Sequence, residues 1–132
     1  MNVPARASTF LSPPSLPITN LLPGGWLQGV EGIQFPTNIS DEIGQAFANV
    51  DLNLKDAGGK GWSQVYRLYS FHTELTPGIS EIMKSNFEKW MPDHKVIWTQ
   101  IGVKQLGAPG MNVELEVVAL DPEGAEKARQ GK

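Results

Sequence analysis

The sequence contains no cysteine, and its 132 residues include only two histidines, His72 and His94. The absence of cysteine excludes disulfide bonds, thiol nucleophiles and cysteine-ligated metals. With two histidines, a metal site would depend on carboxylates, and no stretch has the spacing of a ligand motif. We therefore expect neither a metal nor another cofactor.

Long apolar runs and clusters of basic residues are also missing. No stretch approaches the roughly 20 apolar residues that span a bilayer, and the N-terminus lacks the pattern of a secretory signal. The formal net charge is −3, a poor electrostatic match for nucleic acid. The sequence predicts a cytoplasmic protein with no membrane partner, and its charge argues against a nucleic-acid partner.

The chain divides into three parts. Residues 1–23 carry half of the ten prolines, and because proline cannot donate to a strand ladder, only residues 18–22 remain a candidate strand. Residues 24–120 hold the regular patterns and form the predicted domain. Residues 121–132 are charged, and we expect a frayed C-terminal tail there.

Two helices are predicted. Ser40 is the expected N-cap of the first, with Asp41 and Glu42 in its first turn. Apolar residues then recur at helical spacing as far as Ala57, and the pair at 58–59 (Gly-Gly) ends the pattern. For the second helix, the residues at 76 and 77 (Thr-Pro) supply the cap and first position, and the proline at 92 ends it.

Three strands are predicted over 65–72, 96–105 and 111–120, the last two as a hairpin around the turn at 107–110. The order of elements gives an α+β fold with two helices on one face of a mixed sheet. Alternation, read with the hairpin, places Trp98, Val118 and Leu120 on the face opposite the helices. Such a face is a candidate for burial between subunits.

Two stretches resemble the reactive-intermediate deaminase (RidA/YjgF) family. The first resembles that family's long helix, double-glycine exit and following strand, and the second its closing strands; they read DEIGQAFANVDLNLKDAGGKGWSQVYRLYSFHTEL and VIWTQIGVKQLGAPGMNVELEVVAL. The match covers roughly residues 24–120. No single motif is diagnostic, but the ordered set is fairly specific.

The resemblance implies a chorismate-mutase-like (RidA-type) α+β fold and a homotrimer with small-molecule clefts between subunits. Active members hydrolyse reactive imines or enamines to keto acids and ammonia. An arginine holds the substrate carboxylate, and a glutamate near the cleft positions water. Here the glutamate position is retained as Glu114, while Trp98 occupies the arginine position with Thr99 beside it. An indole has one donor and no charge, so it cannot pair bidentately with a carboxylate. The sequence departs further in its short, proline-rich start and in a shorter loop over 92–96.

Each candidate site residue has a structural alternative. Glu114 would position water, or else be an ion-paired strand carboxylate. Trp98, with Thr99, would line a ligand pocket, or pack in a subunit interface. Arg67 would replace the missing positive charge, or extend to the surface. Tyr69 would line the same cleft, or pack.

The turn formed by Gly24, Gly25 and Trp26 would offer backbone N–H groups to a ligand anion, or be a simple tight turn. It is not a nucleotide loop, because no helix follows it directly.

Three functions compete. The leading hypothesis is a hydrolase acting on an imine, enamine or related reactive intermediate, as an accessory enzyme of a specialised metabolic pathway, with Glu114 as the base. The second is a non-catalytic ligand-binding or interaction trimer that has lost deaminase chemistry. The weakest is an endoribonuclease, which the acidic charge disfavours.

The predicted hairpin also locates the cleft. Its register sets Glu114 opposite Val103 and Ala119 opposite Trp98. Trp98 and Glu114 are then separated by about five residues, or roughly 17 Å along the hairpin. One small ligand could touch both only if they came from different subunits, so a cleft between protomers is expected.

Overall fold

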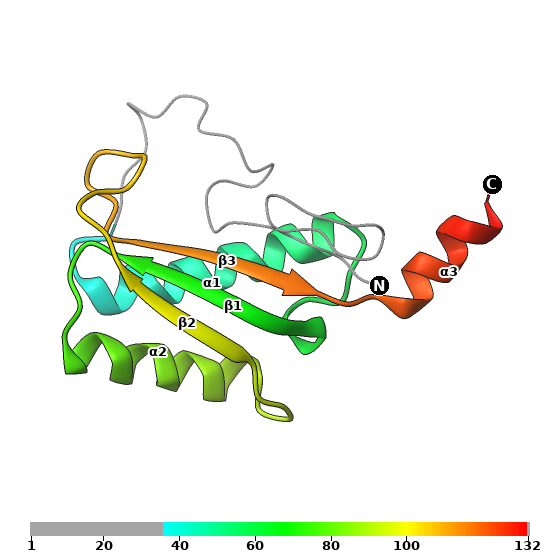
Figure 1. Ribbon diagram of the computed structural model, residues 1–132, viewed down its shortest axis with the longest axis horizontal. Coiled ribbons are helices and arrows are strands. Elements are labelled where there is room, and N and C mark those ends of the chain that lie inside the picture. Colours follow the sequence, from blue (N-terminus) through cyan, green and yellow to red (C-terminus); the bar gives the residue numbers. More distant parts are fainter. Residues whose placement is uncertain (1–35, 132) are drawn as a thin grey trace.

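The computed structural model describes residues 36–131, so the glycine turn at 24–26 and the candidate strand at 18–22 lie outside the described residues. Within that range, helices and strands alternate before two final strands and a last helix (Figure 1). The elements are α1 (Ile39–Asp56), the 3-10 turn η2 (Trp62–Gln64), β1 (Val65–His72), α2 (Pro77–Trp90), β2 (Ile97–Gly102), β3 (Val113–Ala119) and α3 (Pro122–Gln130).

The described strands form a mixed sheet in the order β2-β1-β3. β2 runs parallel to β1, and β3 runs antiparallel to it. The predicted hairpin is therefore wrong: the chain between β2 and β3 crosses β1 instead of folding back on β2 (Figure 1). The turn itself exists, since Met111 N–H donates to the Ala108 carbonyl at 3.1 Å and Gly110 has a φ of 83°. It joins two strands that are not neighbours.

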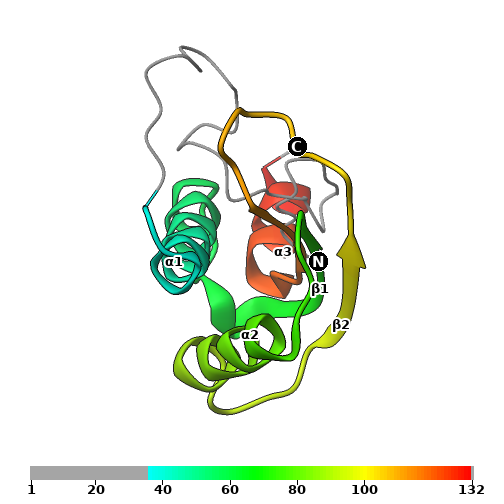
Figure 2. The ribbon, with the colours of Figure 1, turned by 90° about the vertical axis from the view of Figure 1, so that its left-hand side faces the viewer.

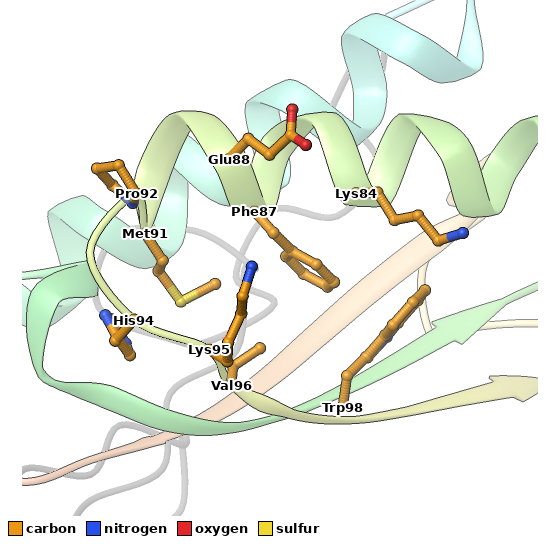
Figure 3. Close-up of a pocket in the computed structure, with 9 residues that line it drawn as sticks. All are labelled: Lys84, Phe87, Glu88, Met91, Pro92, His94, Lys95, Val96 and Trp98. Carbon is orange, nitrogen blue, oxygen red and sulfur yellow. The ribbon is translucent and has the colours of Figure 1, made fainter.

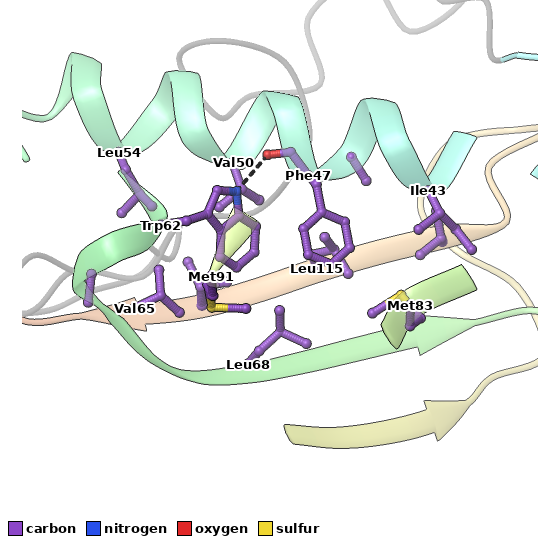
Figure 4. Packing of buried hydrophobic residues seen from close by; sticks show 14 of the residues in the cluster. Ile43, Phe47, Val50, Leu54, Trp62, Val65, Leu68, Met83, Met91 and Leu115 are labelled. Carbon is purple, nitrogen blue, oxygen red and sulfur yellow. Dashed lines mark hydrogen bonds between the residues drawn. The ribbon is translucent and has the colours of Figure 1, made fainter. Parts of the chain in front are cut away.

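Two helices cover one face of this sheet, as the sequence predicts, and the α+β class is confirmed. In Figure 2, α1 and α2 lie side by side against the sheet. The core between these layers includes Phe47 and Val50 from α1, Met83 from α2 and Leu68 and Leu115 from the sheet (Figure 4). Trp62 joins them, stacking on Phe47 with ring centroids 4.8 Å apart and donating its indole N–H to the Phe47 carbonyl at 2.9 Å.

Helix α1 begins two residues earlier than the acidic pattern suggests. Asn38, not Ser40, is the N-cap, and its side-chain oxygen accepts from the Asp41 N–H. Glu42 is buried and accepts from the Asn112 backbone N–H at 2.6 Å, so this first-turn acid also fixes the loop before β3. At the other end Gly58 has a φ of 95°, a left-handed conformation that glycine adopts without a Cβ clash.

The charged C-terminal segment is helical in its described part, which corrects the expectation of a frayed tail. Asp121 caps α3 by accepting from the Gly124 N–H at 3.1 Å, and Pro122 occupies the first turn. Lys60 and Glu123 form an ion pair that ties α3 to the connection between α1 and β1. No helix among residues 36–131 is long and apolar enough to cross a membrane.

Candidate functional site

A pocket of about 580 Å³ lies between the second half of α2 and the start of β2 (Figure 3). Its walls are mainly apolar and aromatic, and its rim carries charged side chains. The lining residues are Lys84, Phe87, Glu88, Met91, Pro92, His94, Lys95, Val96 and Trp98. A volume of this size suits a small organic ligand.

The local sequence explains why the pocket forms at this point. Met91 is the C-cap of α2, and Pro92 cannot continue the helix because it lacks an N–H. The chain therefore leaves α2, passes through a short loop and enters β2 at Ile97. His94 fixes that loop by donating its Nε2–H to the Val65 carbonyl at 2.6 Å. The separation of α2 and β2 leaves the pocket between them.

Trp98 forms one wall of this pocket, on the helix-covered side of the sheet. The parallel register sets it opposite Leu68, which is fully buried under the helices. The expectation that Trp98 lies on the face opposite the helices is therefore wrong. Its ring meets Phe87 edge to face, with centroids 4.9 Å apart, and its indole N–H donates to Ser70 Oγ at 2.9 Å.

Beneath Trp98 lies a buried polar network that the sequence analysis did not identify. Ser70 and His72 are fully buried, and Ser70 Oγ lies 2.9 Å from His72 Nε2. Ser70 accepts from the indole N–H of Trp98. The amide nitrogen of Gln100 beside His72 Nε2 can only donate, so that ring nitrogen accepts and Ser70 directs its own hydrogen to it. Gln100 approaches the same His72 nitrogen at 3.4 Å and accepts from Ser80 at 3.0 Å. The sequence could have revealed this network through the alternate spacing of Leu68, Ser70 and His72, which places their side chains on one face of β1.

This network determines the state of His72. With Nε2 accepting, the proton of the neutral ring lies on Nδ1, a buried atom with no hydrogen-bond partner in the described part of the chain. Burial lowers the pKa of His72 to about 4, because the charged form of the ring loses its hydration there and gains no compensating interaction. The ring is thus neutral at pH 7, and it is a hydrogen-bond partner of Ser70.

The open face of the sheet carries the other candidate residues. Glu114 stands opposite Phe71 and Thr99 opposite Tyr69, all on the side away from α1 and α2. Arg67 shares this face and donates to the Tyr69 hydroxyl at 3.4 Å. Burial, and to a smaller extent the charge of Glu116, raises the pKa of Glu114. This carboxyl therefore holds a proton more readily than an exposed glutamate.

The structure also keeps Trp98 and Glu114 of one chain apart, as the sequence analysis expects, but by a different geometry. Trp98 lies on the helix-covered face, and Glu114 lies on the open face on the far side of β1. Their partners on β1, Leu68 and Phe71, are three positions apart. The two backbones are therefore about 14 Å apart, from three residue steps and two strand spacings. This geometry replaces the hairpin register, and a single chain does not bring the two side chains together.

Comparison with known proteins identifies the family. The family model described as Endoribonuclease L-PSP matches residues 25–121. By sequence, none of the curated proteins matches the chain. The chain belongs to the Endoribonuclease L-PSP family, which is the RidA/YjgF family that the sequence resembles.

Solved structures share the fold at low sequence identity. Yeast Mmf1 is 22% identical with a TM-score of 0.59, covering 69% of this chain and 70% of that one. The Rid protein YyfB from Yersinia pestis is 22% identical with a TM-score of 0.61, covering 69% of each chain. Escherichia coli TdcF, solved with bound serine, is 20% identical with a TM-score of 0.58, covering 69% of this chain and 71% of that one.

Proposed function

We propose that this protein binds a small organic molecule in the pocket between α2 and β2, with Trp98 as its wall. The observation that carries the proposal is the placement of Trp98. Its only polar atom is engaged by Ser70, so the ring is held in one orientation and presents apolar surface to the pocket. The bound serine in the TdcF structure supports a small-molecule role for this fold.

Ligand-observed NMR with a panel of amino acids, keto acids and aromatic acids tests this proposal. Trp98→Ala removes the wall and should abolish binding of any compound that the wild type binds. Trp98→Phe keeps an apolar wall but loses the hydrogen bond to Ser70, so it should weaken binding less. Leu52→Ala is the matched control, since Leu52 is an exposed apolar residue on α1 outside the pocket. Equal binding by wild type and Trp98→Ala would refute the proposal.

A catalytic role is a second candidate, and the raised pKa of Glu114 favours it. In this account Glu114 acts as the base that directs water onto an imine or enamine, giving a carbonyl compound and ammonia. Because Trp98 and Glu114 of one chain lie on opposite faces, a site with both requires two protomers. Ile97, 59% exposed on the open face of β2, fits burial in such a homotrimer.

The test of this second candidate is ammonia release from a freshly generated imine that lacks a carboxylate. Glu114→Gln should lower the rate by about a hundredfold, the usual contribution of a general base. Glu126→Gln is the control because it removes an exposed carboxylate on α3 and leaves β3 unchanged. If Glu114→Gln hydrolyses the imine as fast as wild type, Glu114 is not the base, and the non-catalytic binding role stands alone.

Ribonuclease activity is the least supported candidate. The net charge of −3 opposes binding to a polyanion. Binding of RNA that weakens steeply with added salt would restore this candidate.

A further inference from the structure

The chemistry of the pocket lining identifies a class of ligand, an inference that rests on the proposed binding function. The inner walls offer ring and hydrocarbon surface. Phe87 and Trp98 meet edge to face at an interplanar angle of 83°, so the two rings form a corner. Met91, Pro92 and Val96 complete the apolar lining. Such a corner favours a flat, apolar group that packs against one ring and meets the edge of the other.

The charged residues at the rim are unequal in sign. Lys84 approaches from α2 and Lys95 from the loop before β2, and Figure 3 shows both side chains extending along the pocket. Glu88 is the one acid among the lining residues. Lys84 pairs with Glu81 at 3.1 Å, but both side chains are exposed, so this pair is weak. Lys95 has no ion pair within residues 36–131. The rim therefore carries an excess of positive charge.

Two lysines recognise an anion differently from one arginine. Each ammonium is a compact point charge on a flexible stem, without the planar fork that fixes a carboxylate in one orientation. Lysines from two elements can therefore meet one anionic group from two sides of the rim. A cationic ligand would stack on Trp98 but would be repelled by both lysines.

We infer that the pocket binds a planar aromatic acid, whose ring lies against Trp98 and Phe87 and whose anionic group is held at the rim by Lys84 and Lys95. The two lysines supply positive charge to a site whose wall is an uncharged tryptophan. The ring system provides affinity through burial, and the anion sets the direction in which the ligand enters.

Isothermal titration calorimetry with 1-naphthoate, 1-naphthamide and 1-naphthylmethylamine tests this inference, because the three share a ring system and differ in charge. Wild-type protein should bind 1-naphthoate at least about fivefold more tightly than the neutral amide, and the amine most weakly. Lys84→Gln and Lys95→Gln should each weaken naphthoate binding about fivefold while leaving the amide unchanged. Lys104→Gln, two residues beyond the end of β2, is the matched control and should change neither.

The possible outcomes distinguish a failure of this inference from a failure of the binding function on which it rests. If the amide binds as tightly as the acid and both depend on Trp98, the pocket is real but the lysines do not select an anion. In that case the inference falls and the binding function survives. If 1-naphthoate does not bind at millimolar concentration, the aromatic-acid class is wrong, and the wider ligand panel still tests the binding function. All three lysines are exposed, so the variants should fold like wild type.

Discussion

The indole nitrogen of Trp98 lies 2.9 Å from the hydroxyl oxygen of Ser70, and this hydrogen bond joins the pocket wall to the buried network of the sheet. Ser70 in turn lies 2.9 Å from His72 Nε2. One buried hydroxyl therefore accepts from the tryptophan and donates to the histidine. The orientation of the wall depends on a residue that does not line the pocket.

Removing that hydroxyl should destabilise the protein. Ser70→Ala leaves the Trp98 N–H and the His72 acceptor without their partner in a buried region, and we expect a loss of about 2 kcal/mol in the free energy of unfolding. Urea denaturation measures this loss, with the exposed Ser63→Ala as control. A loss below about 0.5 kcal/mol, the range of neutral surface changes, would show that the network contributes little.

The buried histidine should make the free energy of unfolding fall as the pH is lowered. The folded-state pKa of His72 is about 4, below the ordinary value of about 6.5 that applies in the unfolded chain. Between these two pKa values the unfolded state binds a proton that the folded state does not. Stability therefore falls as the pH drops from about 6.5 to 4, and this contribution becomes constant below about pH 4. The full contribution is about 3 kcal/mol.

Comparison with His72→Gln isolates this effect from other titrating groups. The stability difference between wild type and variant should change by about 3 kcal/mol between pH 7.5 and pH 4, in the direction that favours the variant at low pH. Guanidinium unfolding at a series of pH values measures it. A constant difference across this range would mean that His72 titrates normally in the folded state.

The pKa of Glu114 should respond to the charge of Glu116, its neighbour on β3. Burial is the larger cause of the raised pKa of Glu114, and the charge of Glu116 is the smaller. Glu116→Gln should therefore lower the pKa of Glu114 only in part, leaving it above the ordinary glutamate value. Carbon-13 NMR titration of the side-chain carboxyl reads this directly. A return to the ordinary value would make Glu116, not burial, the dominant cause.

Deaminase activity on imines derived from amino acids should be weak or absent. These substrates carry a carboxylate that a fork of guanidinium donors would hold, and Trp98 offers neither charge nor fork. Ammonia release should fall far below that of a family member with arginine at this position. Comparable turnover would defeat the prediction. Trp98→Arg is a poor test for a gain of deaminase activity, because it would bury a charge beside Phe87 and Ser70 under α2.

The oligomeric state should be a trimer. Light scattering in solution should give about three times the chain mass of 14.4 kDa. A substitution that places charge on the open face, such as Ile97→Asp, should shift the protein toward monomer because it would bury an unpaired carboxylate between subunits. A wild-type monomer at micromolar concentration would contradict both the trimer and a cleft shared between protomers.

Local features of the fold could be predicted from the sequence, whereas strand pairing could not. The strand Val65–His72 and the start of α2 at Thr76 and Pro77 agree with the prediction, because propensity and capping act within a few residues. The hairpin prediction failed because the residues around Gly110 specify only the turn itself. They do not specify whether the flanking strands are neighbours or are separated by a third strand.

The misplacement of Trp98 follows from that pairing error. Alternation along β2 correctly separates Trp98 and Gln100 from Ile97 and Thr99, but it does not say which set faces the helices. The parallel register with β1 decides this by setting Trp98 opposite Leu68. For the same reason the pocket lining from α2 and the loop after it could not be anticipated, and its lysines were missed.

The measurement that tests the binding function most directly is a nitrogen-15 NMR titration that follows the indole N–H signals. Trp98 lines the pocket, whereas Trp62 is buried in the core with its N–H bound to the Phe47 carbonyl. A compound that binds in the proposed pocket should shift the Trp98 signal in a saturable manner and leave the Trp62 signal in place. Saturable binding that leaves the Trp98 signal unchanged, while residues of the open face such as Thr99 shift, would contradict the account.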